Sequence, residues 1–411
     1  MHLDVPRRPF KTGKLLQIPA SVSPWLRLPV FWLACHNYPQ WLYRRLCLWT
    51  VRHDGQRLRY ANYLVYTDST LDFWNGINPY TQEFVDAHGR YFLYTPVFSV
   101  LYWPIAMLPH WLGPFVWNLC NYTLFALSIF TLPKWYDAYK VKIFLSLLLV
   151  LEQSVFPFQF NIVVAYIFIF AYSLLERGHG AWAVVLIMIS SMTKVYGVVE
   201  LLILFCYPKT LRNLCIAGVT GVLLLMSPAL KVGFDGLVPC YMNWWNMLSQ
   251  HQSITYYASL LYALPLRYLL DYYRVIQLIT VGLVVVVFFM KRDQWGNHVF
   301  RATTLGVLMG WIILFGDSSE THTYLIALSG YMLWYWLQER HTVFDKVLFW
   351  ALLVFFGIVP VDVFVPSQVH KFLNDTLYID VYLYALVWFK MVWSMVALKQ
   401  TPGNAAISQA L

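Results

Sequence analysis

Charged side chains are scarce in this chain. They make up 12 % of its 411 residues, about half the share found in ordinary soluble domains. Hydrophobic residues make up 59 %, and the mean hydropathy is +0.55. So few charges cannot cover the water-facing surface of a 48.2 kDa protein, which excludes a soluble globular protein. The composition instead predicts an all-α protein that crosses a membrane many times.

Several signatures of soluble enzymes and metal sites are also missing. The sequence contains no Walker loop, no GxGxxG or GxSxG, no HExxH and no DxD, which removes the usual nucleotide, hydrolase and zinc-protease sites. Its six cysteines have neither CxxC nor Cys/His spacing, so neither a zinc site nor a disulfide framework is predicted. We therefore expect no cofactor, although a divalent metal stays open.

What the chain does have is a series of apolar runs, and about 20 residues suffice to cross ~30 Å of hydrocarbon. We predict a single membrane domain over residues 24–399 with about 10–12 spanning helices, between a cytoplasmic segment 1–23 and a polar tail 400–411. The candidate spans are residues 24–43, 94–109, 111–132, 141–156, 160–176, 181–206, 213–230, 275–290, 302–316, 320–337, 347–364 and 377–397.

Two long polar stretches, 44–92 and 231–274, are rich in aromatic residues. Such segments lie at membrane surfaces, and we expect amphipathic surface helices in the first of them. The Lys and Arg behind the net charge of +9 are scattered over short loops, which is typical of membrane topology and not of nucleic-acid binding. In the second half of the chain they favour an inside N-terminus, whereas the first half argues the other way. We predict a multi-pass protein of the cell (inner) membrane, with 44–92, 231–274 and 317–319 on its outer face.

The first outer loop holds the first candidate for chemistry. Asp68 and Asp72 are four residues apart, so on a helix they share one face and repel each other. Repulsion raises the pKa of one carboxylate and makes it a candidate general base. The alternative is a surface helix with ordinary solvated acids. Arg90 follows later in the loop as a basic group.

Two further polar islands interrupt apolar spans. Gln159 and Asn161 lie between two short spans, where they can hydrogen-bond a sugar or satisfy broken helix ends. Lys194 lies inside a span, where it can hold a lipid phosphate as a point charge or pair with a neighbouring acid.

The last polar segment, residues 316–324, lies at the start of a predicted span. It contains Glu320 and His322, and a histidine can bind phosphate or shuttle a proton near neutral pH. The alternative is a helix cap, with Ser319 as the N-cap and Glu320 in the first turn. The distribution of Lys and Arg over the loops places this segment and Asp68 on the same outer face, which favours a shared pocket.

The order of motifs along the chain resembles glycosyltransferase family 87, the polytopic membrane transferases of the GT-C superfamily, and is closest to its Bacteroidota-type branch. The match is carried by the ordered series and runs from about residue 60 to 340. The motifs are NYLVYTDSTLDFWNGINPY (62–80), YTPVFSVLYWPIAMLP (94–109), VWN (116–118), FQFN (158–161, like the family's GQxN), TKVYG (193–197) and ETHTYLIALSGYMLW (320–334).

The resemblance implies a GT-C-like helical bundle that moves a mannose-like hexose, or a pentose, from a polyprenyl-phosphate donor to a lipid or glycan acceptor. It also implies inversion at the anomeric carbon, a carboxylate general base and contact with membrane lipids. The family's acid falls on Asn62 here, which cannot take a proton as a carboxylate does, and the Gly of GQxN is Phe158. Either the base has moved to Asp68 or Asp72, or Glu320 supplies it, or the transfer activity is altered or lost.

The prediction for the site takes Asp68 and Asp72 as catalytic, with Asp68 preferred as the base. The expected substrate-binding residues are Asn62, Arg90, Gln159, Asn161, Lys194, Glu320 and His322. Two other functions remain open. A lipid-linked saccharide flippase or transporter also places polar groups in the bilayer, although no internal repeat supports it. The Asn62 departure leaves open a noncatalytic protein of envelope assembly.

Overall fold

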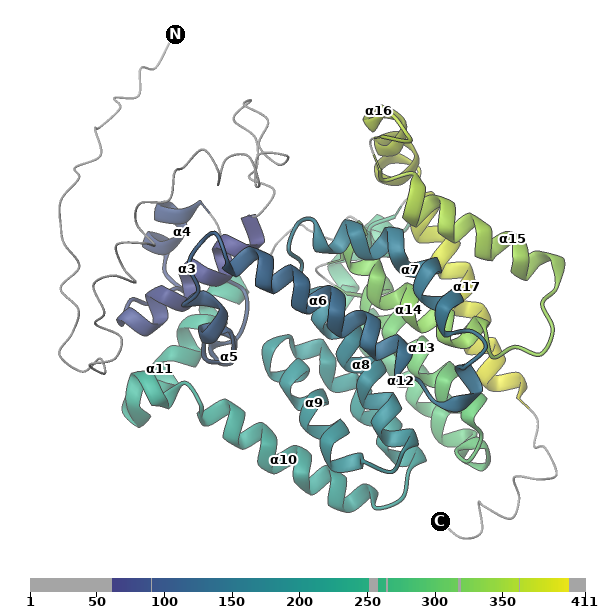
Figure 1. Cartoon of the computed structure of the whole chain (residues 1–411), viewed down its shortest axis with the longest axis horizontal. Coiled ribbons are helices and arrows are strands. Elements are labelled where there is room, and N and C mark those ends of the chain that lie inside the picture. The colour runs from purple at the N-terminus through teal and green to yellow at the C-terminus, as the bar shows by residue number, and fades with distance from the viewer. Residues whose placement is uncertain are drawn as a thin grey trace. The chain divides into compact units, whose positions relative to one another are not determined.

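The computed structural model describes residues 61–89, 91–250, 258–263, 265–316, 319–361 and 363–398. The predicted span 24–43 and Arg90 lie outside these residues. Within the described ranges all regular structure is helical, with no strand, which confirms the all-α class. These helices belong to one compact unit, Gly55–Leu411 (Figure 1).

Each predicted apolar run from residue 94 onward contains a helix, because every such run is long enough to bury or expose a continuous apolar face. The α-helices are α3 (Ala61–Asn75), α4 (Gln82–His88), α5 (Pro96–Ala106), α6 (Gly113–Phe130), α7 (Lys140–Val155), α8 (Asn161–Glu176), α9 (Gly180–Thr193), α10 (Thr210–Met226), α11 (Ala229–Gln250), α12 (Tyr273–Met290), α13 (His298–Leu314), α14 (Tyr324–Tyr335), α15 (Val343–Leu352), α16 (Ser367–His370) and α17 (Ile379–Ala397). The 3₁₀ helices are η3 (Lys134–Tyr136), η4 (Val195–Cys206), η5 (Leu266–Tyr272), η6 (Arg292–Gln294) and η7 (Thr321–Thr323), and the π-helices are η8 (Leu353–Ile358) and η9 (Lys371–Thr376).

Two helical segments in the described part of the chain are long and apolar enough to cross a membrane, Tyr268–Met290 and Ile379–Ala397. A third is added if α10 and α11, which meet at a bend of 93°, count as one broken span. Five other apolar helices are shorter, among them α8, α9 and α13. The first of the two segments exposes large apolar side chains such as Leu278 and Leu283, a surface suited to lipid.

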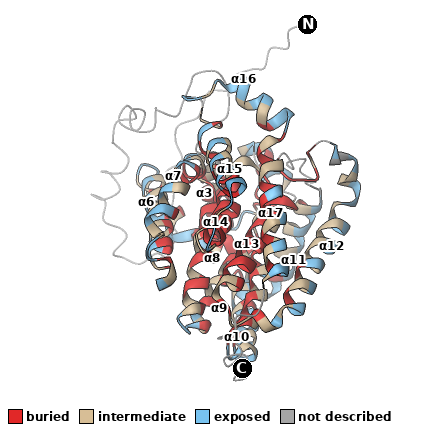
Figure 2. Cartoon of the chain, turned by 90° about the vertical axis from the view of Figure 1, so that its right-hand side faces the viewer, coloured by how far each residue is buried: buried red, intermediate tan, exposed pale blue. Residues whose placement is uncertain are grey.

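The centre of the fold is the pair α13 and α14, the two helices that are most enclosed (Figure 2). They cross at Gly306 and Gly330, where a Cβ atom on Gly306 would lie 2.7 Å from the Gly330 carbonyl oxygen. Only glycine permits this approach of two backbones. Helix α17 covers the pair, and its Trp388 Nε1 and Tyr384 hydroxyl donate to carbonyl oxygens of α13 and α14.

One end of the bundle is closed by a buried ion pair between the last residue of α8 and the start of α13. The Nε and Nη2 atoms of Arg301 each lie 2.7 Å from a carboxylate oxygen of Glu176. The Tyr207 hydroxyl donates to the same carboxylate at 2.9 Å. This bidentate geometry offsets the cost of burying both charges and fixes three segments together.

Helix α3 lies in the predicted first outer loop and is anchored in the fold by one of its sides. It packs along α5, and Tyr63 and Tyr66 are buried together with the polar Thr67, Ser69 and Thr70. Leu64, Asp68, Leu71 and Asp72 on the other side of the helix are only partly buried, so its expected position at the membrane surface stays a prediction.

Candidate functional site

The site is centred on the short link between α7 and α8, where the FQFN motif lies. Phe158 has a φ of 58°, in the left-handed region that favours glycine. This turn exposes the Pro157 carbonyl oxygen, which accepts a 2.8 Å hydrogen bond from Asn62 Nδ2. The predicted binding residue Asn62 thus ties α3 to the link through its amide, and a carboxylate there could not donate this bond.

Two amide side chains after Phe158 connect a cation to a carboxylate. Lys194 Nζ donates to Asn161 Oδ1 at 2.7 Å, Asn161 Nδ2 donates to Gln159 Oε1 at 3.1 Å, and Gln159 Nε2 approaches Glu320 Oε2 at 3.4 Å. Each amide presents its oxygen toward the cation and its nitrogen toward the carboxylate. The dipoles therefore align head to tail between opposite charges, which stabilises both. We call these four residues the amide relay.

The relay joins four of the predicted binding residues from distant parts of the sequence. Gln159 and Asn161 are buried, whereas Lys194 and Glu320 are only partly buried. The two charged ends therefore remain accessible, while the amides between them are enclosed. Burial of hydrogen-bonded amides fixes the positions of both ends.

Lys194 lies where the predicted span 181–206 breaks. Its extended backbone separates α9 from η4, so the lysine is at a helix junction and not in mid-helix as expected. The ammonium lies 5.5 Å from the Tyr94 ring centroid and 5.2 Å from that of Tyr196. The Thr95 hydroxyl donates to the Met192 carbonyl oxygen, which holds the start of α5 beside this junction.

Tyrosines around the lysine are functional candidates that the sequence analysis missed. Tyr196 donates to Asn161 Oδ1 at 3.4 Å, and the Tyr66 and Tyr94 hydroxyls are 3.1 Å apart. Tyr94 and Tyr196 lie in the motifs YTPVF and TKVYG, which was the available signal. Burial is the main cause of the raised pKa of Tyr66, and the negative charge of Glu320 adds to the rise. Tyr66 on α3 and Glu320 therefore lie near each other.

Glu320 is both a helix cap and a member of the relay. It is the N-cap of η7, where it forms a capping box with Thr323. The expectation of Ser319 as the cap was wrong, because its hydroxyl donates to the Ile313 carbonyl oxygen at 2.5 Å. The η7 turn is held against α7 by Ser154, whose hydroxyl donates to the His322 carbonyl oxygen at 2.8 Å. Both interpretations of Glu320 therefore apply at once.

His322 is beside the relay without a side-chain bond to it. Its ring Nδ1 is buried and has no hydrogen-bond partner among the residues that the structure describes. The predicted phosphate-binding or proton-shuttling role of His322 stays a prediction.

Asp68 and Asp72 lie on α3, the helix that carries Asn62. With about 100° per residue, both are on a different face from Asn62 and Tyr66. The pKa of Asp72 is raised, but burial is the cause and His88 opposes it, so the expected repulsion by Asp68 is not what shifts it. Asp68 lies close enough to Tyr63 to add to the rise that burial causes in the pKa of that phenol.

Within the described ranges no group of three or more His, Cys, Asp or Glu residues is arranged to hold a metal ion. The site is instead a cation beside aromatic rings, a buried amide pair and a carboxylate. The cation suits a phosphate, the rings suit a sugar face, and the carboxylate can accept a proton.

This helical membrane protein can now be placed among known proteins. Residues 92–315 match the family model described as Glycosyltransferase family 87, more than half of the chain. The chain belongs to this family and is a membrane glycosyltransferase. Neither the search of curated proteins nor the search of solved structures produced a match. The matched range contains Gln159, Asn161 and Lys194.

Proposed function

We propose that this protein transfers a mannose-like hexose or a pentose from a polyprenyl-phosphate donor to a lipid or glycan acceptor. Transfer takes place at the outer face of the cell (inner) membrane and inverts the anomeric carbon. The acceptor oxygen attacks that carbon, the bond to the lipid phosphate breaks, and the bonding pair leaves with the phosphate. A carboxylate accepts the proton of the acceptor hydroxyl.

The single observation that carries this proposal is the amide relay. It places a partly exposed lysine and a partly exposed glutamate on either side of two buried amides. The leaving phosphate is negatively charged, and an adjacent ammonium stabilises that charge as it develops. Family membership supports glycosyl transfer in general, and the relay supports a phosphate leaving group in particular.

The geometry favours Glu320 as the base over the preferred candidate Asp68. Glu320 is connected to Lys194 through the relay, whereas Asp68 and Asp72 lie on another face of α3 from Asn62. A carboxylate has about four lone-pair positions, so a capping bond and an amide bond leave Glu320 able to accept a proton. Positioned general bases contribute about 10²–10⁴ in rate.

Purified protein assayed with radiolabelled polyprenyl-phosphate sugars tests this assignment through release of the lipid phosphate. We expect Glu320→Gln to lower kcat by about 10²–10⁴, and Asp68→Asn and Asp72→Asn to keep near-native kcat. Loss of activity in Asp68→Asn with a functional Glu320→Gln would return the base to α3. No transfer by the native protein from any such donor would refute the proposed donor class.

Lys194→Met tests the cation and has a matched control. Lys142 also lies over aromatic rings, with its Nζ 5.2 Å from the Trp336 ring centroid, but near the opposite end of α7. We expect Lys194→Met to lower kcat/KM strongly and Lys142→Met to leave it unchanged. Equal effects of the two substitutions would contradict a phosphate at Lys194.

A further inference from the structure

The segment between α15 and α17 carries polar side chains on its inner side. His370, the last residue of α16, and Asn374, in the π-helix η9, are four residues apart, so they lie on one face of this helical segment. Asn374 is 3 % exposed, whereas its neighbours Lys371, Phe372 and Asp375 are exposed. The face that His370 and Asn374 share is therefore turned into the protein.

These two side chains have hydrogen-bonding atoms that the fold leaves unused. Within the described part of the chain, neither His370 Nε2 nor the amide oxygen and nitrogen of Asn374 has a hydrogen-bond partner, and all three atoms are buried. His322 Nδ1 on η7 is in the same situation. A buried polar atom without a partner lowers stability, so a group of such atoms in one region indicates a place that a ligand completes.

Helix α7 holds this segment beside η7. Gln153 Nε2 donates to two carbonyl oxygens of η8, those of Phe356 and Gly357, at 2.8 and 3.1 Å. The next residue of α7 is Ser154, whose hydroxyl donates to the His322 carbonyl oxygen at 2.8 Å. Two consecutive side chains of one helix therefore fix the beginning of the α15–α17 segment and the η7 turn next to each other.

His322 is a common neighbour of this segment and of the amide relay. His370 and Glu320 are both close enough to His322 for their charges to act on its ring. Tyr324, two residues later, packs on η8, with its ring centroid 4.5 Å from that of Phe356. The unused atoms of the segment therefore lie near the carboxylate that we assign as the base.

The chemistry of the unused atoms favours a neutral ligand that both donates and accepts hydrogen bonds. An amide offers donors and an acceptor, and a neutral imidazole offers one of each. Two neighbouring imidazoles are costly to charge together. The carboxylates of Glu320, Asp375 and Asp380 belong to the same region, so they repel a phosphate. A hydroxyl group has no charge to be repelled and suits both donors and acceptors.

Aromatic rings next to Asn374 add a surface for the apolar face of a sugar. Tyr378 follows Asn374 by four residues and is 5 % exposed, and its ring centroid lies 6.1 Å from that of Tyr262. Tyr378 has a φ of 52°, in the left-handed region. Backbone strain of this kind accumulates at functional sites.

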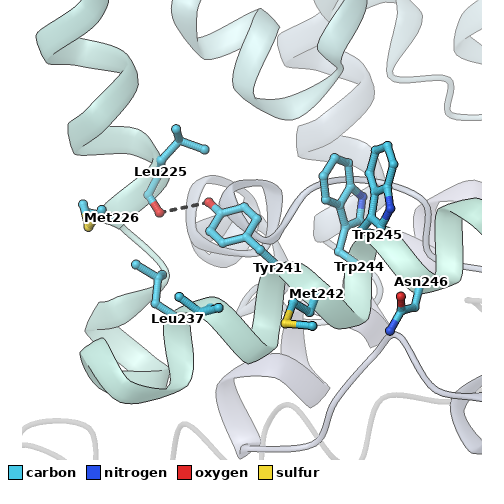
Figure 3. A pocket seen from close by; sticks show the side chains of 9 residues that line it. Leu225, Met226, Leu237, Tyr241, Met242, Trp244, Trp245 and Asn246 are labelled. Carbon is cyan, nitrogen blue, oxygen red and sulfur yellow. Dashed lines mark hydrogen bonds between the residues drawn. The ribbon is translucent and has the colours of Figure 1, made fainter.

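The groove where α10 bends into α11 lacks these properties (Figure 3). Its lining is mainly aliphatic and aromatic, as with Met226, Leu237 and Met242. Its Tyr241 hydroxyl already donates to the Leu225 carbonyl oxygen at 2.9 Å. A hydroxylated ligand therefore finds fewer free hydrogen-bonding groups in this groove than at His370 and Asn374.

We propose that His370 and Asn374 bind a sugar of the acceptor through its hydroxyl groups. The acceptor is then a glycan, or a lipid that carries one, and not a simple lipid alcohol or a phosphate. This assignment rests on the proposed function, because it takes Glu320 as the base that receives the proton of the attacking hydroxyl. Other hydroxyls of the same sugar bind to His370 and Asn374, which holds the attacking one near Glu320.

The test compares acceptors with and without a sugar. Transfer from the radiolabelled polyprenyl-phosphate sugars is measured to octyl and methyl glycosides of mannose, glucose and galactose, and to 1-octanol. Binding of these compounds and of inorganic phosphate is measured without donor. Asn374→Leu and His370→Phe remove the unused atoms, and Thr376→Leu, at an exposed position of η9, is the matched control. Since the Asn374 amide is unbonded, Asn374→Leu should keep at least the native free energy of unfolding.

We expect the native protein to bind and use a glycoside in preference to 1-octanol. Asn374→Leu and His370→Phe should raise the KM and Kd for that glycoside by about tenfold, the effect of losing one hydrogen bond. The KM for the donor should stay native in both variants, and Thr376→Leu should show native values throughout. Preference for the octyl glycoside would support the proposal with a glycolipid acceptor, and equal use of the methyl glycoside would support it with a free glycan.

Native glycoside KM and Kd in both variants, equal effects in Thr376→Leu, or binding of phosphate in place of glycosides would overturn the proposal. Failure of the sugar site and failure of the transferase assignment give different results. Transfer by the native protein with an unchanged acceptor KM in both variants would refute the sugar site alone. Glycoside binding that both variants weaken, without any transfer by the native protein, would refute the transferase assignment alone.

Discussion

The strained turn at Phe158 gives the sharpest test of how the site is built. A side chain at φ 58° costs about 1–2 kcal/mol relative to the right-handed region. Glycine avoids that cost but loses about 0.5–1 kcal/mol through its freer unfolded chain. At ordinary helical positions only the second term applies, so alanine is the more stable choice. At residue 158 the strain of the side chain is the larger of the two costs, so glycine is the more stable choice.

We therefore compare Phe158→Gly with Phe158→Ala, which both remove the ring that packs 5.7 Å from Tyr63. The lost packing cancels between them, and we expect the glycine variant to be more stable by up to about 1.5 kcal/mol. Phe156 is the matched control, because it is the same residue type, exposed, with an ordinary helical φ of −57°. There, alanine should exceed glycine by about 0.5–1 kcal/mol.

The measurement is the free energy of unfolding of each purified variant in detergent, from denaturant titration. The reasoning is refuted if alanine is more stable than glycine at both positions, since Phe158 would then carry no backbone strain. The transfer rate of Phe158→Gly adds a second result. Because Gln159 and Asn161 follow the turn, we expect the relay and the rate to survive this substitution.

Three further predictions concern the surrounding fold. Arg301→Ala leaves the Glu176 carboxylate buried without its bidentate partner and should cost about 3–5 kcal/mol of stability. Gly306→Leu places a Cβ atom 2.7 Å from a carbonyl oxygen of the facing helix and should cost more than about 3 kcal/mol or prevent folding. Burial by itself would raise the pKa of Asp345, but the hydrogen bonds from Lys390 and Thr342 outweigh this effect, so the pKa of this residue is lowered. Its contribution to stability should therefore be present above about pH 4 and lost as pH falls through the lowered pKa.

Each of these has a control in the same chain. Gly282→Leu on α12 has no atom within 4 Å of the new Cβ, so it should leave stability nearly unchanged, and an equal loss at both glycines would contradict tight packing of α13 on α14. Arg301→Lys should recover part of the loss, and a native-like Arg301→Ala would refute the clamp. The free energy of unfolding of Asp345→Asn should decrease less steeply at acid pH than that of the native protein. An identical decrease in both proteins would show that Asp345 does not contribute to the pH dependence. All three are followed by unfolding titrations in detergent.

The helices could be predicted from local patterns because the apolar runs are long and their ends carry proline, glycine or polar residues. Each predicted span from residue 94 onward contains a helix, but α11 lies mostly within the predicted polar stretch 231–274, and only two or three helices in the described part of the chain are long and apolar enough to cross a membrane. The prediction failed where a predicted span is not one continuous helix. Lys194 interrupts the predicted span 181–206, which is continuous in hydropathy, since a helix breaks where tertiary contacts satisfy its freed backbone groups, which composition does not record.

The sequence by itself determined an all-helical membrane protein of glycosyltransferase family 87, and it indicated every member of the amide relay as a polar residue in an apolar setting. Such residues are few, so each needs a reason that local composition can reveal. Only the tertiary structure decided that Lys194, Asn161, Gln159 and Glu320 form one chain of hydrogen bonds, and that Tyr94 and Tyr196 lie beside the lysine. Those contacts join residues up to 161 positions apart, and their geometry depends on how whole helices pack, which no local pattern contains.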